Sequence, residues 1–258
     1  MNATDRYATY PSLRGAGVVV SGGATGLGAQ FVTEFAAQGA RVGFVDVQED
    51  AGRALVEAVA AAGHPRPEFR RADVRDLAGY QEVLRGLAAD LGSVGVLVNN
   101  AADDTRHAST GVDPAAWDAG FRVNLDHQFF AVQALAPALR AAGGGSVVNL
   151  GSISTHVKLR DLVVYRTAKA AVEGLTRALA IELGADAVRV NCVIPGWVMT
   201  ARQLEHHVDA EAEATLDREQ ALARRVQPAD VARLVLWLAA EDSAACTGQN
   251  WIVDGGWM

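Results

Sequence analysis

The sequence has few cysteines and no cluster of metal-binding residues. Cys192 and Cys246 are its two cysteines; they form no C-x-x-C pair, and the six histidines form no H-E-x-x-H or Cys/His zinc pattern. This argues against a disulfide-rich secreted scaffold and predicts no structural metal. The two cysteines could still meet in space, but we expect two buried free thiols in a reducing compartment.

Long apolar runs and basic stretches are also missing. No apolar segment approaches the roughly 20 residues that span a bilayer, and the polar N-terminus MNATDRYATYPSLRG has no apolar signal core. The net charge is −7 and the pI about 5.4, without the basic stripe or tail that suits nucleic acid. We therefore expect a cytoplasmic protein that binds a small molecule, and neither a membrane nor a nucleic acid.

Short apolar runs alternate with helical patterns along almost the whole chain. After an extended lead-in over 1–16, strands are predicted at 17–21, 40–46, 68–74, 94–101, 144–152, 188–196 and 249–256. Helices are predicted at 26–39, 49–62, 76–91, 114–140, 163–184, 200–225 and 228–240. This alternation predicts an α/β fold: one doubly wound Rossmann domain over 1–258, with a seven-stranded, mostly parallel sheet and helices on both faces.

A glycine-rich turn joins the first predicted strand to the first helix. Gly22, Gly26 and Gly28 form G-x-x-x-G-x-G, which lets the backbone approach a pyrophosphate at a helix N-terminus. Asp46 ends the second strand, where a carboxylate can bind both ribose hydroxyls of NAD and repel the 2′-phosphate of NADP. The alternative for Asp46 is an ordinary loop acid. The pattern favours an NAD site.

Polar residues end the next two strands. Asp73, followed by Val74, could accept a hydrogen bond from an adenine amino group. Asn100 and Ala101 follow the fourth strand, where small residues would let a cofactor lie against the backbone. Asn124 lies within the predicted helix 114–140, as a tolerated polar residue or as a holder of water or backbone near Lys169.

Three residues between 147 and 169 could transfer a proton together. Tyr165 and Lys169 are four apart in a helical pattern and so share one helix face, while Ser152 ends an apolar strand. A free tyrosine has a pKa of about 10, and a neighbouring Lys⁺ lowers it by favouring phenolate. Ser152 could bind the substrate oxygen while Tyr165 exchanges its proton. The alternative is a surface Tyr–Lys pair on an exposed helix.

Taken together, these motifs resemble the short-chain dehydrogenase/reductase family over about residues 12–258. The motifs are S-G-x-x-x-G-x-G (21–28), N-N-A (99–101), Asn124, Ser152, Y-x-x-x-K (165–169) and P-G (195–196). Ser21 and Ala102 depart from the usual Thr and Gly. The resemblance implies that Tyr165 is the general acid/base and Ser152 orients the substrate.

The resemblance also implies roles for the neighbours of these two residues. Lys169 would bind the nicotinamide ribose and lower the Tyr165 pKa, and Asn124 would hold a proton-relay water. The implied NAD contacts are Gly22, Thr25, Gly26, Leu27, Gly28, Asp46, Val47, Asp73, Val74, Asn100, Ala101, Tyr165, Lys169, Pro195, Gly196, Val198 and Thr200.

Within the family, the chain is most similar to bacterial NAD-dependent sugar 1-dehydrogenases. DDTRH (103–107), GSISTH (151–156) and CTGQNWIVDGGW (246–257) are among the segments that carry this similarity. It implies oxidation of an aldose at C1 to the lactone, with D-xylose as the first choice and L-arabinose, L-fucose or D-galactose as alternatives. A secondary-alcohol or 3-hydroxyacyl dehydrogenase and a non-catalytic NAD-binding regulator are the competing interpretations.

A sugar requires many hydrogen-bonding groups around it, because each buried hydroxyl must be paired. Trp197 could stack on a pyranose face. His156 and Asp103 are the favoured polar contacts among the sugar-binding candidates, which are Asp103, Asp104, Arg106, His107, Ser152, His156, Tyr165, Trp197 and Arg202.

Two features concern motion and assembly. The segment 197–227 is polar and charged with few core positions, which predicts a mobile lid; the alternative is a static, solvated helix pair. The family resemblance implies a homotetramer. Apolar residues along 163–184 (Val164, Ala168, Ala171, Val172, Leu175, Leu179) and the ending WIVDGGWM agree with such a surface.

Overall fold

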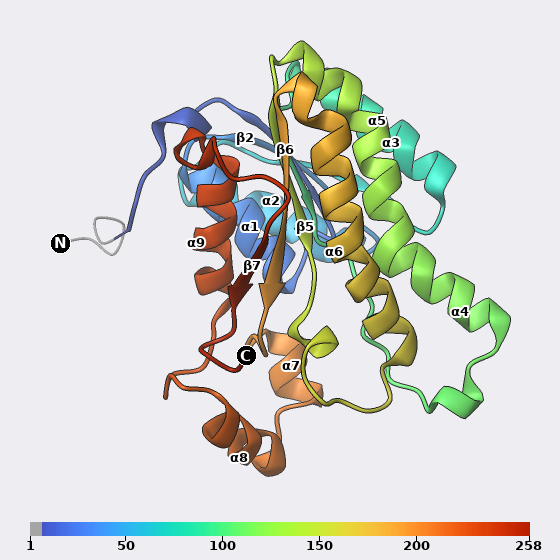
Figure 1. Cartoon of the computed structure of the whole chain (residues 1–258). Coiled ribbons are helices and arrows are strands. Elements are labelled where there is room, and N and C mark those ends of the chain that lie inside the picture. Colours follow the sequence, from blue (N-terminus) through green and yellow to red (C-terminus); the bar gives the residue numbers. More distant parts are fainter. Residues whose placement is uncertain (1–6) are drawn as a thin grey trace.

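All seven strands lie in one parallel sheet, as seen in a computed structural model that describes residues 7–258 (Figure 1). The spatial order is β3-β2-β1-β4-β5-β6-β7. The strands are β1 (Gly17–Ser21), β2 (Arg41–Asp46), β3 (Glu68–Arg71), β4 (Val96–Asn99), β5 (Gly145–Leu150), β6 (Val188–Pro195) and β7 (Asn250–Val253). The order reverses between β1 and β4, which is where doubly wound sheets open a crevice for ligands.

Helices cover both faces of this sheet. α1 (Gly26–Ala37), α2 (Glu49–Ala61) and α9 (Pro228–Ala239) pack on one face. α3 (Leu77–Leu91), α5 (His127–Ala141) and α6 (Val163–Leu183) pack on the other. The predicted doubly wound α/β fold is therefore confirmed, and the sheet is parallel throughout.

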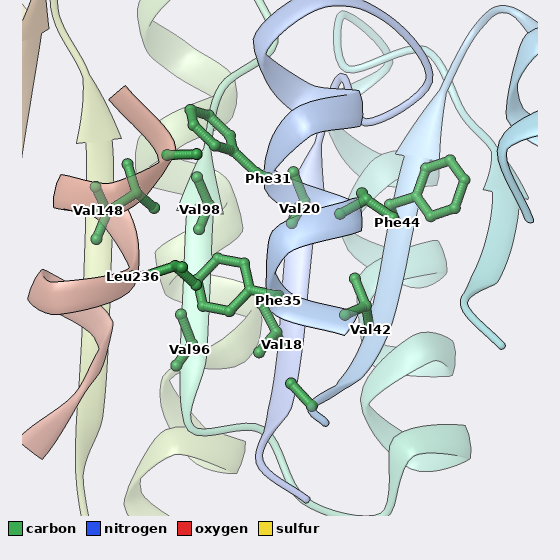
Figure 2. Close-up of a cluster of buried hydrophobic side chains, with 14 of the residues drawn as sticks. Val18, Val20, Phe31, Phe35, Val42, Phe44, Val96, Val98, Val148 and Leu236 are labelled. Carbon is green, nitrogen blue, oxygen red and sulfur yellow. The ribbon is translucent and has the colours of Figure 1, made fainter. Parts of the chain in front are cut away.

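Burial on both faces explains why the strands read as continuous apolar runs. Val18 and Val20 of β1 point toward α1 and pack with Phe31 and Phe35, as Figure 2 shows. Val19, between them, belongs to the cluster on the opposite face. Successive side chains of a strand alternate between faces, so both faces must be apolar when helices cover both.

Several predicted boundaries differ from the structure. The predicted helix 114–140 is α4 (Pro114–Phe121) and α5 separated by a π-helical turn, Arg122–Asp126. The predicted helix 200–225 is two short helices, α7 (Ala201–His206) and α8 (Ala210–Glu219). α8 begins anew because the Asp209 carboxylate caps it, accepting from the Ala212 amide at 2.9 Å.

The remaining differences are smaller. The third, fourth and seventh strands are shorter than predicted, since they extend only over Glu68–Arg71, Val96–Asn99 and Asn250–Val253. Residues 7–16 include a short turn at Pro11–Leu13, and the first part of the predicted lead-in, residues 1–6, lies outside the described residues. Both cysteines are free as predicted; Cys192 is buried, whereas Cys246 is half-exposed. No helix within 7–258 is both long and apolar enough to cross a membrane.

Leu236 provides a test of the core shown in Figure 2, because it is 3% exposed between α9 and the sheet. Leu236→Ala should lower the free energy of unfolding by about 2–5 kcal/mol, since it leaves a cavity. Leu222→Ala is the matched control: this leucine is 55% exposed, so its loss should cost less than about 1 kcal/mol. Urea denaturation measures both, and equal losses would contradict the assignment of Leu236 to the core.

Candidate active site

A pocket opens at the carboxyl ends of the central strands and brings together three of the four predicted catalytic residues with part of the predicted cofactor site. Segments that follow β1, β4, β5 and β6 supply its walls, together with α6 and the C-terminal segment. Its lining includes Leu27, Asn100, Ala102, Asp104, Ser152, Tyr165, Lys169, Pro195, Gly196, Trp197, Val198, Thr200, Gln203 and Trp257.

Tyr165 and Lys169 lie on the inward face of α6. Lys169 is 1% exposed, and its Nζ donates to the Leu150 carbonyl oxygen at the end of β5 at 2.7 Å. The same Nζ lies 5.7 Å from the centre of the Tyr165 ring. Burial lowers the pKa of Lys169 to about 8. The alternative of a surface Tyr–Lys pair is therefore wrong.

The pKa of Tyr165 moves in the direction opposite to the one expected from its neighbour. Burial raises it to about 12, while a hydrogen bond involving Ser152 pulls it down less strongly. The Lys169 ammonium points at Leu150, so the predicted lowering of the Tyr165 pKa is not found in the protein alone. In the protein alone the neutral phenol of Tyr165 is therefore favoured over the phenolate.

Ser152 comes directly after β5 and faces the pocket. It begins a one-turn helix, Ile153–Thr155, where its Oγ accepts from the Ser154 amide at 3.2 Å and donates to the Ser154 hydroxyl at 2.9 Å. These bonds hold the side chain in one orientation while it stays part of the pocket wall.

Asn124 lies in the π-helical turn and is buried. Its Nδ2 donates to the carbonyl oxygens of Asp103 and Gly120, both at 3.0 Å, and its Oδ1 accepts from the Asp103 amide at 3.0 Å. Its own carbonyl oxygen accepts from Gln128 Nε2 at 3.1 Å. Of the two functional interpretations of Asn124, holding backbone matches these contacts, and the held segment is the one that follows β4.

The glycine-rich turn packs too closely for side chains. A Cβ on Gly28 would lie 1.9 Å from the Gly22 carbonyl oxygen, and Gly22 itself has φ +63°. The Asn100 amide group donates to the carbonyl oxygens of Ser21 (3.0 Å) and Gly22 (2.9 Å). The Ser21 hydroxyl accepts from the amides of Asn100 at 2.9 Å and Ala101 at 3.1 Å. Ser21 thereby joins the turn to the end of β4.

Asp46 is buried at the end of β2, beside this turn. Its Oδ2 accepts from the Ala24 amide at 2.9 Å and its Oδ1 from the Gln48 amide at 3.0 Å. It is therefore not an ordinary loop acid. A carboxylate has about four acceptor positions, so it can still receive two ribose hydroxyls.

The residues predicted for the adenine end lie near a second hollow. Val47 and Asp73 line it, and Val74 is buried next to it. The Asp73 carboxylate pairs with the Arg75 guanidinium at 2.6 Å, which lowers the Asp73 pKa. Thr25, at the N-terminus of α1, and Gly26 are exposed, and a Cβ on Gly26 would lie 3.7 Å from Thr200 Cγ2.

The polar wall of the pocket comes from Asp104 and the segment after β6. Asp104 Oδ1 pairs with Arg202 Nη2 at 3.0 Å, and its Oδ2 accepts from Gln203 Nε2 at 3.0 Å. Gln203 Oε1 in turn accepts from Trp197 Nε1 at 2.9 Å. The Trp197 ring stacks on Trp257, with centroids 6.4 Å apart. Arg202 supports this wall from outside the pocket lining.

Two favoured sugar contacts are placed elsewhere. Asp103 is exposed and turns to its own loop, accepting from the Thr105 amide at 3.0 Å and hydroxyl at 2.6 Å. His156 Nε2 lies 2.8 Å from Glu173 Oε1, outside the pocket lining. The structure thus gives each of these side chains a local partner outside the pocket lining, and contact of either with a sugar stays a prediction. His107 is held through its backbone to Asp161 and does not line the pocket, whereas Arg106 does.

Gln203 and Trp257 were not predicted. A signal for Gln203 exists in hindsight, since Thr200 caps α7 by accepting from the Gln203 amide at 3.3 Å, which fixes that residue in the first turn. Trp257 had no comparable signal, because only the tertiary fold brings the C-terminal segment to the pocket.

The predicted lid is seen packed in place. The Met199 amide donates to Val226 at 2.9 Å, and the Leu222 amide donates to Gly255 at 2.9 Å. Leu216 of α8 is fully buried, so the segment does possess a core position. The two ends of the segment are therefore tied down, and its mobility stays a prediction.

Known dehydrogenases are similar to this chain over nearly its whole length. A family model described as enoyl-(acyl carrier protein) reductase matches residues 22–258. A D-xylose 1-dehydrogenase of Caulobacter vibrioides is 47% identical over 250 residues, or 97% of this chain and 98% of the relative. A protein described as a probable galactose dehydrogenase of Rhizobium meliloti is 44% identical over 247 residues, or 96% of each chain.

Solved structures share the fold. A 7α-hydroxysteroid dehydrogenase complexed with NADH and 7-oxo glycochenodeoxycholic acid superposes with a TM-score of 0.90 at 27% identity, covering 95% of this chain and 96% of that one. The chain therefore belongs to the short-chain dehydrogenase/reductase family of oxidoreductases, as its motifs predicted.

Proposed function

We propose that the chain, as one domain over 1–258, is an NAD-dependent sugar 1-dehydrogenase that oxidises an aldose, D-xylose first, at C1 to the lactone. The observation that carries the proposal is the wall formed by Asp104, Gln203 and Trp197 beside Ser152 and Tyr165. It offers a carboxylate, an amide and a flat aromatic ring, which suit the hydroxyls and apolar face of a pyranose. The similarity to sugar dehydrogenases supports the same choice.

The residues present fit a nicotinamide dinucleotide. The cradle that excludes a side chain at Gly28 leaves backbone amides at the start of α1 for a pyrophosphate. The buried Asp46 carboxylate would hold the ribose hydroxyls and repel a 2′-phosphate, which favours NAD over NADP. Thr200, close to Gly26, and Val198 would hold the nicotinamide end.

Each catalytic residue then has a defined task. Ser152 donates a hydrogen bond to the C1 oxygen of the sugar, and Tyr165 takes the proton of the anomeric hydroxyl. Bound NAD⁺ supplies the hydride acceptor. Lys169, fixed by Leu150, would bind the ribose hydroxyls of the cofactor. Asn124 keeps the segment before Asp104 in place.

One observation favours a second substrate class, a secondary alcohol. Part of the pocket lining is apolar and is formed by Ile153, Val157, Leu159 and Leu162. An alcohol with a hydrocarbon body would bury against it. A pentose has no such body, so the two classes are separated by turnover.

The homotetramer stays a proposal, with changed support. Most of the apolar residues expected to face a partner from α6 are buried in the chain itself; these are Val164, Ala168, Val172 and Leu179. Apolar residues that are exposed on the relevant elements include Phe129 on α5, Val163 and Ile181 on α6, and Ile252 on the edge strand β7. These suit contacts between copies of the chain. A cytoplasmic location also stays a prediction from the sequence.

Absorbance at 340 nm, which follows NADH formation, tests substrate and cofactor together. With NAD⁺ we expect turnover of D-xylose above that of L-arabinose, L-fucose, D-galactose and simple secondary alcohols. NADP⁺ should support less turnover, because its 2′-phosphate would be repelled by the Asp46 carboxylate. Turnover of alcohols alone would refute the sugar site and keep the family mechanism, and preference for NADP⁺ would refute the role of Asp46.

Tyr165→Phe should lower turnover by about 10²–10⁴-fold, because it removes the general base, and should leave NAD⁺ binding unchanged. Since the pKa of Tyr165 is about 12 in the protein alone, the phenolate fraction grows with pH, and kcat/KM for oxidation should rise from about pH 6 to 9.

Tyr10→Phe, remote from the pocket, is the control for this substitution and should keep wild-type rates. If Tyr165→Phe keeps its activity, another residue must be the general base. If the protein is a regulator that needs no catalysis, Tyr165→Phe should keep its regulatory output.

The structure separates two adjacent aspartates. Asp104→Asn should raise KM for D-xylose about tenfold, because a charged hydrogen-bond acceptor is lost from the pocket wall. Asp103→Asn is the matched control and should leave KM unchanged, since that carboxylate faces its own loop. The steady-state KM of both variants decides; a larger effect at Asp103 would show that the wall is assigned to the wrong residue.

A further inference from the structure

A third residue continues the row formed by Tyr165 and Lys169. Glu173 lies four residues beyond Lys169 on α6, so all three share one face of the helix. Tyr165 reaches the pocket and Lys169 reaches the end of β5. The Glu173 side chain is only 12% exposed, and the mechanism above assigns it no task.

The Glu173 carboxylate joins three segments that are distant in the chain. Its Oε1 lies 2.8 Å from His156 Nε2 and 3.3 Å from Thr155 Oγ1, both in the turn after β5. Its Oε2 accepts from Asn250 Nδ2, at the start of β7, at 2.5 Å. A mostly buried carboxylate costs free energy unless such partners surround it. The cluster is therefore a built set of contacts.

The Thr155 side chain links the Glu173 carboxylate to the backbone of Ser152. The Thr155 hydroxyl lies 2.9 Å from the Ser152 carbonyl oxygen as well as near Glu173, so its single proton is shared between the two acceptors. The one-turn helix after Ser152 is thus held at two points: its middle residue, Ser154, bonds the Ser152 hydroxyl, and its last residue, Thr155, is held to Glu173 on α6.

We propose that Glu173 is a positioning residue for Ser152: it holds the turn after β5 against α6 and β7, so that the Ser152 hydroxyl faces Tyr165. This inference rests on the proposed role of Ser152 in sugar oxidation. The same helix face then sets both partners of the proton transfer, Tyr165 directly and Ser152 through Glu173. His156, expected to contact sugar, acts instead as a partner of this carboxylate.

The primary test is Glu173→Ala, assayed with D-xylose and NAD⁺. We expect kcat to fall about tenfold because Ser152 loses its fixed position, while the Kd for NAD⁺ stays unchanged. Glu182→Ala is the matched control, an exposed glutamate on the same helix, and should keep the wild-type kcat. Thermal unfolding of each variant shows that the comparison is made on folded protein.

Two more conservative variants test the same proposal even if Glu173→Ala does not fold. Glu173→Gln should recover most of kcat, because its amide oxygen still accepts from Thr155 and His156. Its amide nitrogen can donate to Asn250 Oδ1, which is buried without a partner among residues 7–258. Thr155→Val should lower kcat in the same direction as Glu173→Ala and by less.

A double-mutant comparison distinguishes positioning from general support. In a Ser152→Ala background, Glu173→Ala should cause no further loss of kcat, since the group that it positions is gone. An equal further loss, or a wild-type kcat in Glu173→Ala alone, would overturn the inference. If Ser152→Ala itself keeps the wild-type kcat, the proposed role of Ser152 fails and the inference fails with it.

Discussion

The bond between the Lys169 ammonium and the Leu150 carbonyl oxygen is the contact on which the site depends. It ties the middle of α6 to the end of β5 inside the protein, where a charge is stable only with a partner. The two elements that carry Tyr165 and Ser152 are thereby brought to one place. Burial has opposite effects on the two ionisable groups, lowering the pKa of Lys169 to about 8 and raising that of Tyr165 to about 12. Both effects disfavour the charged form, so the protein alone resists the charge that the reaction requires.

The order of the strands determines where a cofactor could supply positive charge near Tyr165. The glycine-rich turn lies at the ends of β1 and β4, and the segments after β5 and β6 continue the same edge toward the wall of Asp104, Gln203 and Trp197. In the proposed function, Gly28, Asp46 and Thr200 would hold NAD⁺ at this edge. The positive charge of its nicotinamide would then favour the phenolate of Tyr165.

The sequence predicts the parts of this arrangement that depend on periodicity and turn chemistry. Apolar runs and capping residues were enough for seven parallel strands, and the spacing of Tyr165 and Lys169 was enough for a shared helix face. The sequence does not predict which of two chemically identical neighbouring side chains faces the pocket. Asp103 and Asp104 are adjacent and chemically identical, yet the first closes its own loop and the second faces the pocket.

The choice between those aspartates depends on Asn124, which grips the backbone at Asp103. That contact crosses 21 positions of sequence and involves a π-helical turn, which no local pattern announces. The burial of Lys169, and with it the direction of the Tyr165 pKa, is likewise a property of packing. Trp257 reaches the pocket only through the return of the C-terminal segment.

The close packing at Gly28 implies that the glycine-rich turn tolerates fewer substitutions than the polar wall of the pocket. At the dinucleotide end the walls are backbone atoms, and a single added methyl group would collide with the Gly22 carbonyl oxygen. At the opposite end the walls are the long side chains of Gln203 and Trp197, held by replaceable hydrogen bonds. Single substitutions can thus alter the polar wall without moving the main chain, whereas a side chain at Gly28 would require the main chain of the turn to be rebuilt.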